Sequence, residues 1–175
     1  GTVVEMGREF ESAKKFDTVR KMKSIAAEKT LLLKKEQEEV QPRLEALIPL
    51  FENGEYKQAV ERARSIIEDN PKVMYAYHIL GSAYKQLGQK DEARQAFEYI
   101  VRTATDYDDA LEFADGAHFH LGTMCLAEEQ LLEALEHFKI CMHLNPSHQK
   151  AREFYWLLIE NETHSSELVG SDSIA

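Results

Sequence analysis

The sequence predicts an all-α protein: a right-handed α-solenoid of about three repeated helical pairs, with a long N-terminal helix and a C-terminal capping helix. Helix-forming residues dominate, because only 4 of the 175 residues are proline and 8 are glycine. Ala93 and Phe97 also have counterparts 41 residues later, at Ala134 and Phe138. Recurrence at a fixed interval is typical of repeat proteins.

Two further pairs support this period. Ala59 precedes Ala93 by 34 residues, and Gly81 precedes Gly122 by 41. One unit therefore occurs three times, with seven extra residues in the last interval. The predicted units lie near 40–73, 74–105 and 115–148.

Each unit is predicted to contain two helices. In the middle unit, apolar residues three and four apart mark the first helix: Tyr77, Leu80, Tyr84 and Leu87. Gly88 is expected to end it in the left-handed conformation. Gly81 and Ala93 are expected to be small because the two helices cross closely there.

These residues resemble the tetratricopeptide repeat, a 34-residue helix–turn–helix unit with the signature W-x2-L-G-x2-Y, then A-x3-F, then Pro. The middle unit matches with tyrosine in the Trp position and Thr105 in the Pro position: Tyr77, Leu80, Gly81, Tyr84, Ala93 and Phe97. The third unit has Cys125 in the Tyr position and otherwise matches at Leu121, Gly122, Ala134, Phe138 and Pro146. The first unit is degenerate, with Leu47 in place of Gly and only Ala59 and Pro71 clear. The resemblance covers roughly residues 40–148.

The flanking segments complete the expected domain organisation. Residues 148–161 form an amphipathic capping helix within a domain of residues 40–161, and residues 162–175 are expected to be a flexible, Ser-rich tail. The seven extra residues are expected to lengthen the first helix of the third unit from about residue 106. An irregular loop between repeats is the alternative.

Residues 1–39 form a separate helical segment, either one helix or two joined helices. Its apolar residues suggest a stripe that must be covered, with Val3, Met6, Phe10, Val19, Ile25 and Leu32 as members. The stripe could pack against the chain's own repeats or against a second copy. Residues 3–35 are therefore a possible surface for homo-oligomerisation.

Composition limits the classes of partner and compartment. The net charge of −10 disfavours nucleic-acid binding, which usually requires a basic surface. The two cysteines, Cys125 and Cys141, cannot form a disulfide framework, so we expect a reducing, cytoplasmic compartment. No apolar run reaches 18 residues. We expect membrane attachment only if an anchoring segment upstream of Gly1 has been removed.

The sequence offers no catalytic constellation, and we expect neither an enzyme nor a bound metal or cofactor. His118 and His120 are two residues apart, so on a helix they point in different directions. His137 and Cys141 could face one another, but Cys141 occupies a core position. A buried thiol beside a surface imidazole is the favoured interpretation, with a metal protein or an enzyme as the less favoured one.

The resemblance implies a concave groove lined by the first helices of successive units. The expected groove residues are Leu44, Ile48, Phe51, Tyr75, His78, Ser82, Lys85, Phe119, Thr123, Leu126 and Lys150. Family members that bind the acidic EEVD-type carboxyl terminus of heat-shock chaperones use a Lys/Asn/Arg clamp. The corresponding positions here lack that clamp: Leu44, Ile48, Ile79, Gly116 and His120. A chaperone peptide is therefore disfavoured.

The function expected from this pattern is a non-enzymatic adaptor or scaffold. Its groove would bind a protein or peptide partner, helical or extended, through apolar anchors. The alternative function is a structural component that self-assembles through the N-terminal helix. Some of the groove side chains could instead be core between the repeats.

Overall fold

The computed structural model describes residues 2–104 and 108–171, and all its regular elements in these ranges are helices. They are α1 (Thr2–Glu45), α2 (Leu47–Glu52), α3 (Tyr56–Asp69), α4 (Met74–Gln86), α5 (Lys90–Thr103), α6 (Asp108–Ala127), α7 (Leu131–Leu144) and α8 (Gln149–Ser171). The chain divides into two units, Gly1–Arg43 and Leu44–Ala175. The all-α prediction is confirmed.

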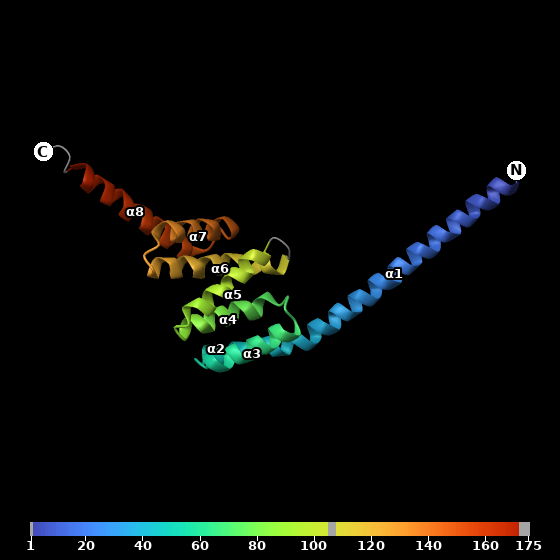
Figure 1. Cartoon of the computed structure of the whole chain (residues 1–175), viewed down its shortest axis with the longest axis horizontal. Coiled ribbons are helices and arrows are strands. Elements are labelled where there is room, and N and C mark those ends of the chain that lie inside the picture. The colour runs from blue at the N-terminus through green and yellow to red at the C-terminus, as the bar shows by residue number, and fades with distance from the viewer. Residues whose placement is uncertain (1, 105–107, 172–175) are drawn as a thin grey trace. The chain divides into compact units, whose positions relative to one another are not determined.

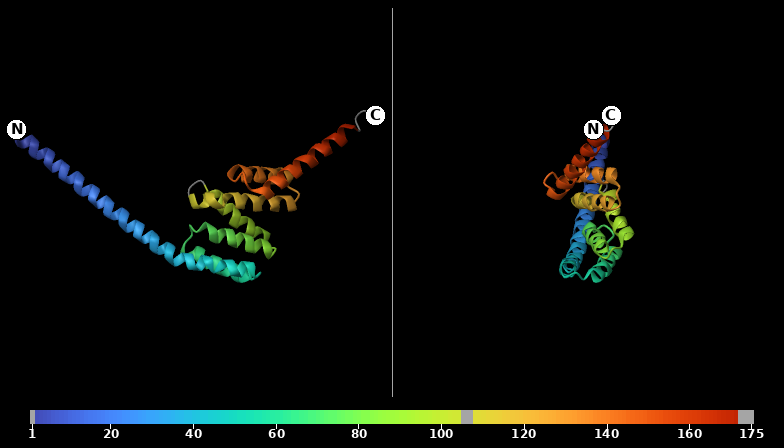
Figure 2. Two further views of the ribbon diagram at one scale, coloured as in Figure 1. Left: turned by 180° about the vertical axis from the view of Figure 1, so that it is seen from behind. Right: turned by 90° about the vertical axis from the view of Figure 1, so that its left-hand side faces the viewer.

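The second unit is a series of helical pairs, α2–α3, α4–α5 and α6–α7, followed by α8 (Figure 1). Each helix from α2 to α8 contacts the next along the chain, as the views in Figure 2 also show. The first helices of the pairs also contact each other, α2 with α4 and α4 with α6. This arrangement is a helical repeat, as the period predicts.

The turns inside the three pairs have the same backbone geometry. Gly54, Gly88 and Glu129 adopt the left-handed conformation, with φ of 75°, 74° and 61°. In the second turn, the Gly88 N–H donates to the Lys85 carbonyl (3.1 Å) and the Gln89 N–H to the Tyr84 carbonyl (2.9 Å). The first and third turns repeat both bonds at equivalent residues, which satisfies carbonyls at the helix ends. Gly88 therefore ends its helix as predicted.

The two helices of a pair approach closely at a glycine. A Cβ atom built on Gly81 would lie 2.9 Å from the Phe97 ring, and one on Gly122 would lie 2.8 Å from the Phe138 ring. Both phenylalanine side chains are fully buried. The small residue in the first helix thus makes room for the large one in the second.

Two helix ends lie beyond the predicted domain limits, at α1 and α8, and the length of α6 bears on the seven-residue insert. The long N-terminal helix continues past residue 39, and past Pro42 inside it, to Glu45. Pro49 then has no N–H to donate to the Glu45 carbonyl. Helix α6 has 20 residues where α4 has 13, so a helix and not a loop occupies most of the seven-residue insert; residues 105–107 lie outside the described residues. Helix α8 continues to Ser171, ten residues past the expected capping helix, and 172–175 lie outside the described residues.

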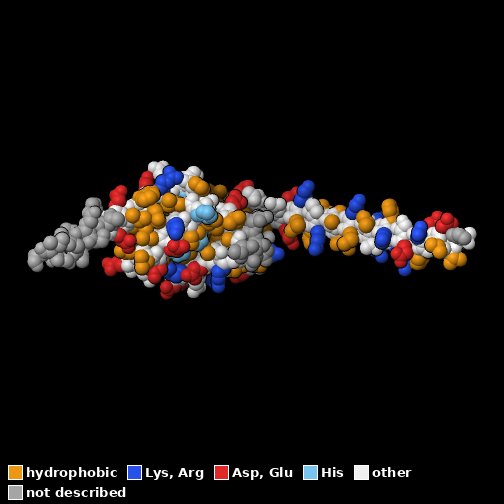
Figure 3. All heavy atoms as spheres, turned by 90° about the horizontal axis from the view of Figure 1, so that it is seen from above, with side chains coloured by type: hydrophobic (Ala, Val, Ile, Leu, Met, Phe, Trp, Pro, Cys, Tyr) orange, Lys and Arg blue, Asp and Glu red, His pale blue; other side chains and the backbone are white. Residues whose placement is uncertain are grey.

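Helix α1 differs from its prediction in a second way, because none of its residues is buried. Its eleven large apolar side chains from Val3 to Leu33 are 49–82% exposed. Hydrophobic and charged side chains are interspersed along it in Figure 3. From Phe10 to Ile25 the apolar residues recur every third position, so they do not form one straight stripe. The expected covered stripe is not present in the described chain.

Candidate functional site

The predicted groove residues of the second unit lie on five helices. Leu44 lies at the end of α1, Ile48 and Phe51 on α2, Tyr75, His78, Ser82 and Lys85 on α4, Phe119, Thr123 and Leu126 on α6, and Lys150 on α8. The four residues of α4 are spaced three, four and three apart and therefore share one face of that helix. That face meets α6, and we call the contact region the α4–α6 seam.

The seam is held by a polar contact between Lys85 and α6. The Lys85 ammonium donates to Thr123 Oγ1 at 2.6 Å and lies 3.4 Å from His120 Nδ1. The His120 ring stacks on Phe97, with 4.6 Å between centroids and 14° between planes. Burial is the main cause that lowers the pKa of His120 to about 3, and the positive charge of Lys85 adds to it. The imidazole is therefore neutral and can accept a hydrogen bond from the Lys85 ammonium.

The other end of the seam is aromatic. Tyr75 and His78 on α4 both contact Phe113 on α6, at centroid distances of 5.8 and 6.0 Å. Nδ1 of His78 is buried and has no hydrogen-bond partner in the described structure. Burial lowers the pKa of His78, against an opposing effect of Asp115, so this imidazole too is uncharged at neutral pH.

Phe119 lies between three helices and belongs in part to the core. The centroid of its ring lies 4.7 Å from that of His148, 6.0 Å from that of Phe138 and 6.1 Å from that of Phe154. Phe119 and Leu126 both pack against the core cluster around Phe138. For these two groove residues the core interpretation holds at least partly.

The remaining predicted residues lie apart from the seam. Ile48 is 42% exposed and Lys150 is exposed, while Phe51 packs edge-on against Tyr56 at 5.2 Å. Among the described side chains, no hydrogen bond or ring contact joins Ile48, Phe51 or Lys150 to the seam. The structure thus joins Lys85 to Thr123, and Tyr75 and His78 to Phe113, whereas Ile48, Phe51 and Lys150 lie outside these contacts.

Sequence reasoning missed part of the α6 side of the seam. Phe113, Gly116, His120 and Thr123 are spaced three, four and three apart, the same spacing as the α4 face they contact. Matching this spacing between neighbouring first helices could have identified Phe113 as well. Asp115, which accepts from Asn145 at 2.8 Å, gave no comparable signal.

The histidines behave largely as their spacing predicts. His118 faces His137 on α7, with 3.0 Å between the two Nδ1 atoms, whereas His120 faces Lys85. His137 is paired with His118 rather than with Cys141, which is fully buried and whose pKa is raised to about 12 by burial. The described residues include no group of three or more His, Cys, Asp or Glu side chains suited to hold a metal ion.

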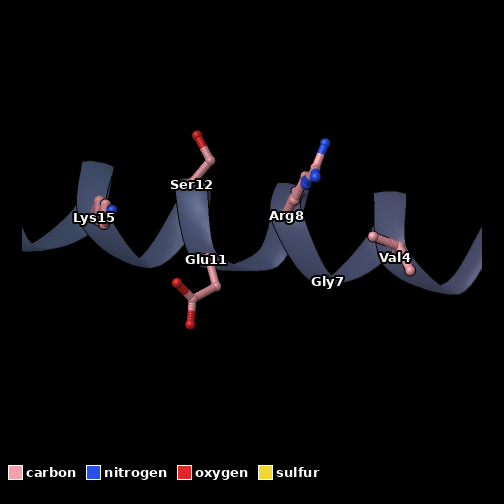
Figure 4. A pocket seen from close by; sticks show the side chains of 6 residues that line it. All are labelled: Val4, Gly7, Arg8, Glu11, Ser12 and Lys15. Carbon is pink, nitrogen blue, oxygen red and sulfur yellow. The ribbon is translucent and has the colours of Figure 1, made fainter.

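Surface depressions away from the seam lie in two regions of the described chain. One, of about 520 Å³, is shared by α3, α4 and α5, and includes Arg64, Arg102 and the stacked pair Tyr77 and Tyr99. The other lies on α1 alone. Figure 4 shows that its side chains, such as Arg8 and Glu11, project from this one helix in different directions. The depression on α1 is therefore helix surface rather than a binding cavity.

Comparison with known proteins agrees with this architecture. Residues 75–102 match the family model described as tetratricopeptide repeat. Among solved structures, the chain is similar to the first TPR domain of the human RPAP3 protein, determined by NMR. The TM-score is 0.56 at 18% sequence identity, over 78% of this chain and 97% of that one. No curated protein sequence matches the chain. None of the described helices combines the length and the apolar character needed to span a bilayer.

Proposed function

We propose that this chain, which carries a tetratricopeptide repeat within an all-α repeat fold, is a non-enzymatic adaptor that binds a peptide or a helix along the face made by α2, α4 and α6. Folds of this kind are protein–protein interaction modules. The observation that supports the proposal is the seam, where α4 and α6 present Tyr75, Lys85 and Thr123 together.

The apolar anchors of the partner would bind beside the seam, at exposed or half-buried apolar side chains of α2, α4 and α6. Ile48 is partly exposed on α2, and Tyr75 and Phe119 are half-buried. A bound apolar side chain would remove further surface from water, and each fully buried Leu-sized side chain contributes about 1.5–3 kcal/mol. A micromolar complex requires about 8 kcal/mol beyond the entropic cost of association, so several such anchors would have to act together with polar contacts.

The test is selection of displayed random peptides on the full chain, followed by binding measurements with variants. We expect the selected peptides to share apolar positions, and to bind Ile48→Glu at least about tenfold more weakly. Leu132→Glu is the matched control, since Leu132 is 72% exposed on α7, the second helix of its pair. Equal binding to wild type and Ile48→Glu would assign the peptides to another surface.

A second function, self-assembly through residues 3–35, is favoured by the exposed apolar side chains of α1. It predicts that the full chain is an oligomer in light scattering. The double substitution Phe16→Glu and Ile25→Glu should then convert it to a monomer. A wild-type chain that is already monomeric at high concentration would refute this second function.

A further inference from the structure

Lys85 is a half-buried cation whose described partners are all neutral. Its ammonium contacts the Thr123 hydroxyl and the His120 imidazole, and among the described residues no carboxylate oxygen lies within 4.0 Å of it. Burial lowers the pKa of Lys85, and no acidic side chain in the described part of the chain opposes that effect. The cation is thus partly removed from water without a counter-charge.

This arrangement is unusual for so acidic a chain. Residues 41–175 contain 23 Asp and Glu against 12 Lys and Arg. The more exposed Arg94 does have a carboxylate partner, Glu128, at 2.8 Å. Buried charges in proteins are normally paired, because an unpaired charge loses its hydration without compensation. Although acidic side chains are abundant in residues 41–175, none of the described ones is paired with Lys85 in the seam.

The geometry leaves one donor of Lys85 for a ligand. An ammonium group has three N–H donors, and two are accounted for by Thr123 and His120. The His120 ring is stacked on Phe97, which fixes the position of the Nδ1 atom that accepts from Lys85. Lys85 is not fully buried, so part of its side chain is open to a ligand.

We infer that Lys85 binds a carboxylate of the partner peptide, completing an ion pair that the free chain lacks. This inference rests on the proposed function, because it concerns the same face. The partner peptide would carry an acidic group next to its apolar anchors. The position differs from the chaperone-clamp positions, which hold Leu44, Ile48, Ile79, Gly116 and His120 here.

The experiment uses the full chain and the displayed random peptides as probe. We expect the selected sequences to contain Asp or Glu at one fixed position. Synthetic peptides carrying Glu there should bind wild type about 10- to 100-fold more tightly than their Gln versions. Lys85→Met should remove that preference, while Lys139→Met, at an exposed lysine of α7, should retain it. The carboxylate could belong to an Asp or Glu side chain or to the C-terminus of the peptide. Amidating the C-terminus distinguishes the two, since it removes only the C-terminal carboxylate.

The outcomes separate this inference from the proposed function. Peptides that depend on Ile48 but show no acidic position, or bind Lys85→Met with the same preference for Glu, would overturn the inference and leave the groove proposal intact. Failure to select any peptide that depends on Ile48 would overturn both. Thermal unfolding of Lys85→Met provides the folding control. Loss of the contacts with Thr123 and His120 and removal of an uncompensated charge act in opposite directions, so we expect the variant to remain folded at the temperature of the binding assay.

Discussion

Replacing glycine by alanine inside a helix should have opposite effects at two positions of the second unit. At Gly81, the new Cβ atom would lie 2.9 Å from both Cε1 and Cζ of Phe97, well inside van der Waals contact. At Gly116, the nearest atom is His78 Cε1 at 3.5 Å, which is an ordinary contact. The same chemical change thus creates a steric overlap in one helix and an ordinary van der Waals contact in the other.

The magnitudes follow from two terms. Alanine is favoured over glycine in a helix interior by about 1 kcal/mol. Overpacking a well-filled core costs about 1–3 kcal/mol. The Phe97 ring cannot withdraw easily, because it is fully buried and stacked on His120. The upper part of the overpacking range, about 2–3 kcal/mol, therefore applies at Gly81. After subtraction of the helix-propensity gain, we expect Gly81→Ala to lower the free energy of unfolding by about 1–2 kcal/mol, and Gly116→Ala to raise it by up to about 1 kcal/mol.

The assay is urea unfolding of each full-length variant, followed by far-UV circular dichroism. Gly122→Ala is a second case of the crowded type, with its Cβ 2.8 Å from Phe138. The reasoning is refuted if Gly81→Ala unfolds at the same or a higher urea concentration than wild type. It is equally refuted if Gly116→Ala is destabilised as much as Gly81→Ala.

Three further predictions concern titration, reactivity and backbone strain. Burial lowers the pKa of His118 to about 4, and that of His120 to about 3, so below pH 6.5 the unfolded chain binds protons that the folded chain does not. The free energy of unfolding should therefore decrease as the pH is lowered from 6.5 to 4, by at most about 1.4 kcal/mol per pH unit for each histidine. Urea titrations that give the same free energy of unfolding across this range would contradict this. Cys141 should react with iodoacetamide only after unfolding, because it is fully buried and its pKa is about 12; rapid labelling of the native chain, read by mass spectrometry, would disprove it. Glu129→Gly should stabilise the chain by about 1 kcal/mol, since φ is 61° there, whereas Glu133→Gly inside α7 should destabilise it by a similar amount in thermal unfolding.

The repeat could be predicted from sequence because its packing requires particular residues at particular places. A glycine opposite a buried phenylalanine recurs with the period, at Gly81 with Phe97 and Gly122 with Phe138. The left-handed turn position recurs too, but only two of its three occupants are glycine. The spacing of 34 residues between Gly54 and Gly88 was therefore an available signal for the degenerate first unit.

The groove could be predicted only in part, because the residues of a surface are not fixed by packing alone. The face of α4 follows from helical spacing, and the structure places Lys85 against Thr123 as that spacing suggests. Whether Phe119 faces solvent depends on how α8 packs against α6, and its contact with Phe154 could not be read from either helix alone. That no carboxylate of the described residues lies at Lys85 is likewise a property of the assembled seam.

The three-residue spacing of the apolar side chains in α1 has a consequence for whatever binds that helix. Each step of three residues rotates the side chain by about 60° backwards around the helix axis, because three residues fall short of one turn. Phe10 and Val19, three steps apart, therefore project from opposite sides, and so do Phe16 and Ile25. A flat surface, or a single straight helix alongside, covers only one side at a time. A partner that buries both members of either pair has to surround the helix.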